Sequence, residues 1–331
     1  MKTINIKSKL KEYKVYIDNH LLDNLNDFLD TDRFYVIVSD NQIPVQYIKK
    51  VQSALPKNLV ITFPAGENSK SLSQFESIIL TLQKNNIKRD ACIVALGGGV
   101  TGDLAGYVAS VYLRGIDYIQ IPTTLLAQID SSVGGKVAIN TVNAKNSIGS
   151  IYPPSLVIID PSTLDTLDSR QFNNGMAEMI KYGMIHSKVL FDEILFSDIK
   201  SNITHFIYES VLIKKYYIEN DEFDTGIRQK LNFGHTYGHA YEALYNYEKY
   251  LHGESVALGM LKVSNFDGVK GPLIKVLTKY NLPIKDDATD KDLISYIIND
   301  KKSTRDSINL ITVNEIGKAE IVKKNIQEVL I

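Results

Sequence analysis

Short apolar segments, rich in β-branched and aromatic residues, alternate with segments of helical spacing over about the first 160 residues. This alternation is typical of a parallel sheet built from strand–helix units. The sequence therefore predicts an N-terminal α/β domain with a parallel, Rossmann-like sheet. We predict strands over 14–17, 34–39, 58–63, 91–96, 117–122 and 155–160. We predict helices over 42–54 and 72–86, and a third that GGGVTGD opens and that runs through Val111.

The pattern changes after Pro161. From about 163 to 298 it is mostly helical, and residues 308–313 and 318–321 form either a short hairpin or irregular structure. Because clefts between domains are common ligand sites, we expect the active site in the cleft between the two domains. The predicted domains are an α/β domain over 1–161 and a mainly α-helical domain over 162–331.

Composition narrows the class of protein. The chain has 331 residues and 44% hydrophobic content, enough for two domains with their own cores. A net charge of −1 argues against nucleic acid or an anionic membrane as a partner. No apolar run approaches the ~20 residues of a membrane span, and the N-terminus lacks the apolar core of a secretory signal. The single cysteine, Cys92, excludes an intramolecular disulfide. We expect a cytoplasmic protein with Cys92 in a core strand.

The segment from Leu231 to Met260 carries three of the six histidines. His235 and His239 are four residues apart, so a helix places both on one face, and His252 begins a second segment. Spacing alone favours His235 and His239 as a ligand pair. A lone histidine is usually explained without a metal, but three histidines within 18 residues are harder to explain that way. With a carboxylate from elsewhere they predict a divalent-metal site.

The segment GMAEMIKYG (175–183) supplies a carboxylate. Glu178 and Lys181 share a helix face and are surrounded by apolar residues. An exposed i,i+3 salt bridge is the simpler interpretation and is worth only ~0.2–0.5 kcal/mol. A metal better explains a desolvated Glu178. Lys214 and Arg228 add cationic groups that suit an anionic substrate.

A glycine-rich segment, GGGVTGD (97–103), follows a predicted strand and opens a helix. Its glycines fit GxGxxG, which brings backbone N–H groups close to a diphosphate at a helix N-terminus. The motif follows the third or fourth predicted strand instead of the first, and Asp117 precedes its strand instead of closing it. We therefore expect phosphate or dinucleotide binding with a different topology. A tight strand-to-helix turn is the alternative.

Two other segments are candidate ligand-binding loops. GENSK (66–70) follows a predicted strand, so it can line one crevice with GGGVTGD, although Asn68-Ser69 is also an ordinary helix start. Residues 121–149 mix polar and apolar side chains over a length that is unusual for a surface loop. The alternative is a structured connection whose polar residues are caps, but this would not explain the presence of Lys136. The polar residues of this second segment are Thr123, Thr124, Asp130, Lys136, Asn140, Lys145 and Asn146.

Together these segments resemble the 3-dehydroquinate synthase family. The matching segments, in order, are GENSKS, GGGVTGDLAGYVAS, RGI, IPTTLLAQIDSSVGGKVAIN, AKNSIG, GMAEMIKYG, NFGHTYGHAYE, HGESVALGM and DKK. The resemblance implies a homodimeric lyase that binds NAD and a divalent metal, zinc or cobalt. It implies conversion of 3-deoxy-D-arabino-heptulosonate 7-phosphate to 3-dehydroquinate and phosphate, with NAD regenerated.

The resemblance also implies roles for individual residues. The metal ligands would be Glu178, His235 and His252, which leaves His239 facing the substrate. Arg114 would reach the substrate phosphate, across the dimer, as would Lys301 or Lys302. The remaining implied substrate contacts are Asp130, Lys136, Asn146, Lys181, Lys214, Arg228 and Asn232. The implied NAD contacts are Asp40, Gly66, Glu67, Lys70, Gly98, Gly99, Val100, Thr101, Gly102, Asp103, Thr123, Thr124, Lys136, Lys145, Thr163, Leu164, Asp165 and Thr166.

The chain departs from the family pattern at Gln171, where a glutamate is common, and this puts only that contact in doubt. Three alternatives remain open on the sequence. A related sugar-phosphate cyclase would bind a substrate without a carboxylate, whereas Arg228 with Lys214 favours one. A metal-dependent polyol dehydrogenase would accumulate NADH and would not need those cations. A non-catalytic nucleotide-binding protein would not need the metal ligands.

Overall fold

The computed structural model describes residues 1–142, 144–264, 266–298 and 307–325. The chain forms two compact units, Met1–Leu167 and Asp168–Ile331. The division follows residue 167, whereas the sequence placed it near 161, because the short 3-10 helix η5 (Pro161–Thr166) is bonded into the first unit. Tyr47 and Thr166 share a hydrogen bond of 3.1 Å between their hydroxyl oxygens. Within the described residues, no helix has the length and apolarity that a membrane crossing requires.

The first unit is built on a seven-stranded sheet in the order β1-β2-β9-β6-β5-β3-β4. All neighbouring strands are parallel except β1 and β2, so the predicted parallel α/β sheet is confirmed. β1 was not predicted, although Ile4 and Ile6 are buried at the period of two that a strand requires. The strands are β1 (Lys2–Ile6), β2 (Tyr13–Ile17), β3 (Tyr35–Asp40), β4 (Asn58–Phe63), β5 (Cys92–Gly97), β6 (Asp117–Pro122) and β9 (Leu156–Ile159).

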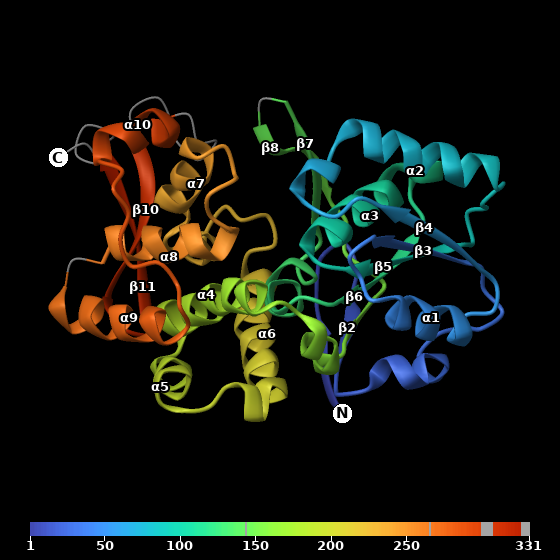
Figure 1. The fold of residues 1–331 in the computed structure, drawn as a ribbon, viewed down its shortest axis with the longest axis horizontal. Coiled ribbons are helices and arrows are strands. Elements are labelled where there is room, and N and C mark those ends of the chain that lie inside the picture. Colours follow the sequence, from blue (N-terminus) through green and yellow to red (C-terminus); the bar gives the residue numbers. More distant parts are fainter. Residues whose placement is uncertain (143, 265, 299–306, 326–331) are drawn as a thin grey trace. The chain divides into compact units, whose positions relative to one another are not determined.

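Helices cover both faces of this sheet, as Figure 1 shows for α2 and α3 on one side of the strands and α1 on the other. Alternate strand residues enter opposite cores: Val36 and Val38 pack toward α2 and α3, and Ile37 packs toward α1. Burial on both faces explains why these strands read as continuous apolar runs. The helices of this unit are η1 (Leu21–Asp27), α1 (Val45–Ala54), η2 (Glu67–Ser69), α2 (Leu72–Lys84), α3 (Gly99–Val111) and η3 (Tyr112–Arg114).

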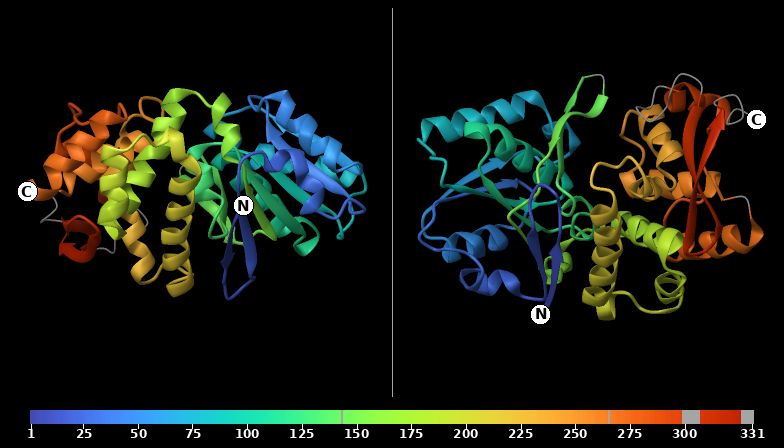
Figure 2. Two further views of the ribbon diagram at one scale, coloured as in Figure 1. Left: turned by 90° about the horizontal axis from the view of Figure 1, so that it is seen from below. Right: turned by 180° about the vertical axis from the view of Figure 1, so that it is seen from behind.

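The polar segment 121–149 becomes a π-helical turn, η4 (Ala127–Ser131), followed by a hairpin of β7 (Lys136–Thr141) and β8 (Ala144–Ile151). The sequence did not predict these strands, because their residues alternate imperfectly and include Gly, Asn and Ser. Figure 2 shows the hairpin, in green, as a two-stranded ribbon separate from the main sheet. Val137 and Ile139 anchor it in the α2–α3 core.

The second unit is mainly helical, as predicted, and carries a C-terminal hairpin of β10 and β11. The hairpin is one of the two alternatives that the sequence left open. The elements of this unit are α4 (Ser169–His186), α5 (Lys188–Phe196), η6 (Lys200–Asn202), α6 (Ile203–Asn220), η7 (Ile227–Asn232), α7 (His235–Leu244), α8 (His252–Lys262), α9 (Asp267–Lys279), α10 (Asp290–Ile298), β10 (Ser307–Glu315) and β11 (Lys318–Asn325).

Asp286 fixes the loop between α7 and α8. Its side chain has no exposed surface, and it accepts hydrogen bonds from Tyr245, Lys249 and Tyr250 at 2.7–2.8 Å. Burial alone would raise the pKa of this carboxyl, but the hydrogen bonds outweigh burial and lower the pKa to about 2.

The lowered pKa makes the contribution of Asp286 to stability depend on pH. A carboxyl with a folded pKa near 2 and an unfolded pKa of 3.8 stabilises the fold fully above pH 4. This contribution is lost as pH falls through 2. Because Lys249 is partly exposed and screened, we expect the contribution to be on the order of 1 kcal/mol. Urea unfolding should give an Asp286→Asn variant that is less stable than wild type at pH 6, with a gap that narrows toward pH 2. A gap that is constant with pH would contradict this account.

Candidate metal centre and cofactor-binding edge

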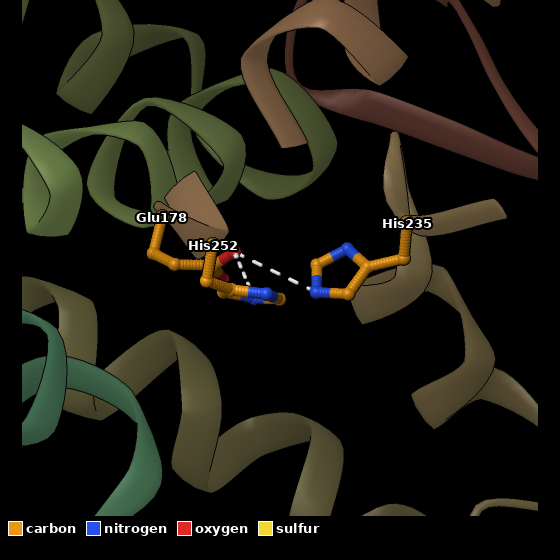
Figure 3. A group of neighbouring side chains, drawn as sticks. All are labelled: Glu178, His235 and His252. Carbon is orange, nitrogen blue, oxygen red and sulfur yellow. Dashed lines mark ion pairs between the residues drawn. The ribbon is translucent and has the colours of Figure 1, made fainter. Parts of the chain in front are cut away.

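Three donor side chains converge in the second unit: Glu178 from the middle of α4, His235 at the start of α7 and His252 at the start of α8. Glu178 Oε1 lies 3.6 Å from His235 Nε2 and 3.7 Å from His252 Nε2. Figure 3 shows dashed lines from the Glu178 carboxylate to both imidazole rings. The Glu178 side chain is fully buried, whereas His235 and His252 are partly exposed. The group is therefore reachable from its histidine side.

Glycines bring the three helices close enough for this convergence. Gly234, in a left-handed conformation with φ of 78°, precedes α7, and a Cβ there would lie 2.8 Å from Val256 O of α8. A Cβ at Gly259 of α8 would overlap the carbonyl oxygen of Gly234. At the other side of α8, a Cβ at Gly253 would overlap the carbonyl oxygen of Asn174 in α4. The backbones of α4, α7 and α8 therefore meet directly where the three donors are carried.

The donor set fits a divalent metal. Glu178 Oε1 is buried and has no hydrogen-bond partner among the described residues, and both histidine nitrogens are too distant to be one. His235 Nδ1 lies 3.2 Å from Phe233 O and His252 Nδ1 lies 3.5 Å from a Glu242 oxygen, so both rings face an acceptor on their far side. Metal-binding histidines usually have such an acceptor at the ring nitrogen that faces away from the metal. Ligand distances of about 2.0–2.2 Å from a common ion agree with the observed separations.

His239 is placed differently from the other two histidines. Its ring centroid lies 5.4 Å from that of His235, but its donor atoms group with Glu242 and His252 instead of Glu178. The i,i+4 pair that spacing alone favoured is therefore not the pair that meets the Glu178 carboxylate. Both groups share His252, whose two ring nitrogens face opposite carboxylates.

The second unit, which carries this centre, also holds three buried cations. Lys181, Lys214 and Arg228 are 2%, 6% and 3% exposed. Lys181 is ion-paired with Glu178 Oε2, so the pair is buried and not the exposed salt bridge that was the simpler interpretation. Arg228 donates from Nη1 to Glu222 O at 2.7 Å. Burying charge is costly unless the charge is offset, so this density of cations favours a site for anionic groups. Asn232 ends η7 directly before α7, and Lys301 and Lys302 lie outside the described residues.

In the first unit, the residues implied to contact NAD, other than Lys136 and Lys145 of the β7–β8 hairpin, follow the carboxyl ends of five adjacent strands, β9-β6-β5-β3-β4. The order in which successive strands join the sheet reverses between β3 and β5, which are parallel neighbours although β4 intervenes in sequence. Such a switch point is where ligands of open α/β sheets bind. The five junctions are Thr163, Leu164, Asp165 and Thr166 after β9; Thr123 and Thr124 after β6; Gly98, Gly99, Val100, Thr101, Gly102 and Asp103 after β5; Asp40 at the end of β3; and Gly66, Glu67 and Lys70 after β4.

Close packing against neighbouring side chains explains two of the glycines in the segment GGGVTGD. A Cβ at Gly97 would lie 2.5 Å from Thr101 Oγ1, and a Cβ at Gly102 would lie 2.5 Å from Gln120 Oε1 of β6. Gly98 and Gly99 form the start of α3, where backbone N–H groups point out of the helix. Thr123 Oγ1 is buried without a hydrogen-bond partner. An open helix N-terminus beside an unsatisfied hydroxyl fits a dinucleotide phosphate.

A hydrogen-bond network joins this edge to the β7–β8 hairpin. Lys70 Nζ donates to Asp103 Oδ2 and to Asn146 Oδ1, both at 2.5 Å. Asn140 donates from Nδ2 to Glu67 Oε1 at 2.8 Å. Lys70 was implied to contact NAD directly, yet its side chain is only 6% exposed and holds α3 and the hairpin together. The hairpin also carries Lys145 within β8 and the exposed Lys136 at the start of β7.

Asp117 has a structural role at the opposite end of β6. Partial burial opposes its ionisation, but hydrogen bonds from Lys11, Ser155 and Arg33 hold the pKa of this carboxyl well below its usual range. It lies at the amino end of its strand and therefore takes no part in the carboxyl edge. Asp130 lies instead within the π-helical turn η4, a geometry that is frequent at functional sites.

Arg114 is exposed on a strained turn. Leu113 and Arg114 both have positive φ, 49° and 65°, although neither is glycine. Consecutive left-handed residues are costly and are typically retained where function requires a fixed side-chain direction. Leu113 is also 45% exposed.

Sequence reasoning missed three polar residues that organise the two sites. Gln128, fully buried, donates to Pro122 O and Thr163 Oγ1 and so ties the β6 junction to η5. Glu254 pairs with Arg170 through both oxygens at 2.7 and 2.8 Å. Glu242 faces His252, and its position seven residues after His235 on the same helix face could have identified it. Gln171, the departure from the family pattern, accepts from Asn174 Nδ2 at 3.4 Å.

Models of the N-terminal and C-terminal regions of 3-dehydroquinate synthase match residues 60–174 and 175–303. A relative named 3-dehydroquinate synthase, from Clostridium kluyveri, is 40% identical over 349 residues, covering 99% of this chain and 97% of the relative. One from Dictyoglomus thermophilum is 42% identical over 344 residues, covering 99% and 96%.

Two solved structures also match nearly the whole chain. The complex of 2-deoxy-scyllo-inosose synthase with carbaglucose-6-phosphate, NAD⁺ and Co²⁺ has a TM-score of 0.88 and 25% identity, covering 99% of each chain. The 2-epi-5-epi-valiolone synthase of Streptomyces hygroscopicus, with NAD⁺ and Zn²⁺, has a TM-score of 0.86 and 26% identity, covering 98% and 96%. A probable glycerol dehydrogenase from Sinorhizobium meliloti, at a TM-score of 0.64 and 17% identity over 87% and 89%, shares the fold alone.

Proposed function

This chain belongs to the 3-dehydroquinate synthase family, and we propose that Glu178, His235 and His252 hold the divalent metal of its active site. The activity is that of a phosphate-eliminating carbon–oxygen lyase of the shikimate pathway. It converts 3-deoxy-D-arabino-heptulosonate 7-phosphate to 3-dehydroquinate and phosphate with NAD and a divalent metal as cofactors. The buried, unsatisfied Oε1 of Glu178 between two imidazole nitrogens is the observation that supports this ligand set.

The bound metal supplies a Lewis acid toward the substrate hydroxyls, and NAD supplies a reversible hydride acceptor. The protein orients these groups. Glu178 uses its two oxygens differently, because Oε2 stays with Lys181 while Oε1 remains available as a ligand. Two protein nitrogens and one oxygen leave coordination positions open, as in catalytic zinc sites.

The buried cations account for an anionic substrate. Lys181, Lys214 and Arg228 are held inside the second unit, where low dielectric strengthens their attraction for a carboxylate or phosphate. Arg228 presents a rigid fork suited to carboxylate, which a sugar phosphate without a carboxylate would not require. We therefore propose that the lysines and Arg228, with Asn232 and His239, bind the substrate in this unit. Their desolvated charges are the feature that favours an acid substrate over the alternatives.

Residues of the first unit provide the remaining proposed contacts to NAD and to the substrate. The ends of five adjacent strands bind NAD, supported by the switch point between β3 and β5 and by the unsatisfied Thr123 hydroxyl. Asp130 in η4, with Lys136 and Asn146 of the β7–β8 hairpin, contacts the substrate. Because Lys70 joins Asn146 to Asp103, it couples the hairpin to the cofactor edge.

We also propose that the protein is a cytoplasmic homodimer in which Arg114 reaches the phosphate bound by the other copy. The support is the strained pair Leu113 and Arg114, which fixes an exposed guanidinium beside an exposed leucine. A monomeric mass of the purified, metal-loaded protein in solution would exclude the dimer.

The activity is tested with purified protein, Zn²⁺ or Co²⁺, NAD⁺ and the heptulosonate phosphate. We expect stoichiometric release of inorganic phosphate with no lasting NADH absorbance, because the hydride returns within each turnover. Glucose 6-phosphate and sedoheptulose 7-phosphate, which lack the carboxylate, should release phosphate at least about 10²-fold more slowly, since the Arg228 guanidinium would have no substrate carboxylate to bind. Steady accumulation of NADH would indicate a polyol dehydrogenase, and faster turnover of either control substrate would indicate a related cyclase.

A further inference from the structure

Glu242 lies on the side of His252 that faces away from Glu178. It is carried by α7, seven residues after His235, so one helix provides both a proposed ligand and this carboxylate. Glu242 Oε2 lies 3.5 Å from His252 Nδ1, while His252 Nε2 lies 3.7 Å from Glu178 Oε1. The ring of His252 is therefore held between two carboxylates, one at each nitrogen.

The two nitrogens of a neutral imidazole have different roles in this arrangement. One ring nitrogen carries a proton and donates, and the other accepts. A carboxylate at Nδ1 favours the tautomer with its proton on Nδ1, which leaves the lone pair on Nε2. That lone pair then faces Glu178 Oε1, which lacks a hydrogen-bond donor among the described residues. Both atoms are acceptors, so a cation bound between them would stabilise this arrangement. We propose that Glu242 is a positioning residue that fixes the tautomer and ring orientation of His252 for metal binding.

The two histidines differ in how they are oriented. His235 Nδ1 faces the backbone carbonyl of Phe233 at 3.2 Å, a neutral acceptor that no side-chain substitution removes. His252 Nδ1 faces a charged carboxylate whose side chain is only 5% exposed. A carboxylate at the far nitrogen of a metal-binding imidazole orients the ring. His252 is therefore the ligand whose binding strength depends on another side chain, and Glu242 is that side chain.

A competing arrangement uses the same residues. His239, Glu242 and His252 also form a group of donor atoms close enough to hold a metal. In that arrangement Glu242 would be a ligand, and His252 would bind through its opposite nitrogen. Glu178 and His235 would then be dispensable for metal binding. The inference rests on the proposed ligand set, so the test must separate the two arrangements.

The test measures the dissociation constant of Zn²⁺ by chelator competition for apo full-length protein and five variants: Glu242→Gln, Glu242→Ala, Glu178→Gln, His235→Ala and His239→Ala. We expect Glu242→Ala to weaken Zn²⁺ binding by 10–100-fold and Glu242→Gln, which keeps an acceptor, to weaken it less. Glu178→Gln and His235→Ala should weaken it more than either, and His239→Ala should leave it near wild type. Circular dichroism of each apo variant controls for folding.

A second readout identifies the ring nitrogen of His252 that binds the metal. In zinc-loaded wild-type protein with ¹⁵N-labelled histidine, Zn²⁺ at Nε2 should leave the His252 proton on Nδ1, whereas Zn²⁺ at Nδ1 would indicate the competing arrangement. We expect the Co²⁺ absorption spectrum of Glu242→Gln to keep the intensity of the wild-type site.

The outcomes are distinguishable. Wild-type Zn²⁺ affinity in both Glu242 variants would overturn the inference and leave the proposed ligands standing. Loss of Zn²⁺ in the Glu242 and His239 variants, with retention in Glu178→Gln and His235→Ala, would overturn the inference and the proposed ligand set together.

Discussion

Replacing His252 with alanine is expected to remove the metal and abolish turnover while the protein stays folded. Among the described residues, His252 is one of three proposed metal ligands, and its loss should cost more than the 10–100-fold typical of a residue that only orients a ligand. We expect Zn²⁺ affinity to fall by about 10³-fold or more, and phosphate release by a similar factor, since the Lewis acid contributes several kcal/mol. The ring is 31% exposed, so truncation leaves no large cavity.

A histidine outside the cluster provides the matched control. His205 is 38% exposed and faces Glu193 at 3.4 Å on the surface of the second unit. His205→Ala should keep wild-type metal content and turnover. Metal content is read by atomic absorption after dialysis and folding by circular dichroism. Full metal occupancy in His252→Ala would show that the ligand assignment is wrong.

Adding one methyl group to α8 should be as damaging as removing a ligand. In Gly259→Ala the new Cβ would overlap the carbonyl oxygen of Gly234. The oxygen is a backbone atom and the backbone fixes the position of the Cβ, so no side-chain rotation relieves the overlap. The helices α7 and α8 must then separate, which costs about 1–3 kcal/mol and more where the backbone is rigid. Because His235 lies directly after Gly234, the separation also displaces a proposed ligand. We expect a lower melting temperature together with weaker Zn²⁺ binding.

Replacing a glycine of α9 with alanine should instead raise the stability of the protein. A Cβ at Gly268 would meet nothing within 4 Å outside its chain neighbours, and the position is helical. Alanine there should stabilise the protein by about 0.5–1 kcal/mol, because glycine loses more backbone entropy on folding, and metal affinity should not change. Equal effects of Gly259→Ala and Gly268→Ala on the melting temperature would show that helix contact at Gly259 is not limiting.

The sequence predicted the sheet well because its strands are buried on both faces. Segments such as 91–96 and 117–122 are continuous apolar runs bounded by turns, and each became a strand within about one residue of the prediction. The edge strand β1 and the β7–β8 hairpin were missed. Their sequences are half polar, and tertiary pairing, with β2 or with the α2–α3 core, decides their structure more than local propensity does.

The candidate site was predictable in its residue types and less so in its pairings. Three histidines and an apolar-flanked glutamate indicated a metal, yet the i,i+4 rule selected His235 with His239. The structure brings His252 to Glu178 instead, because close contacts at Gly234 and Gly259 join α7 to α8, and the contact of Gly253 with Asn174 joins α8 to α4. Local spacing describes one helix only. Packing between helices depends on contacts that no single segment encodes.

The five-strand cofactor edge has a consequence for the order in which the enzyme is assembled during synthesis. Its residues run from Asp40 to Thr166, and β9 must insert beside β6 before the last junction exists. The three metal donors all come later, between Glu178 and His252. Domains generally fold as units in the order in which they leave the ribosome. A nascent chain would therefore complete the proposed NAD site first, and it would gain the proposed metal site only after α8 had been made.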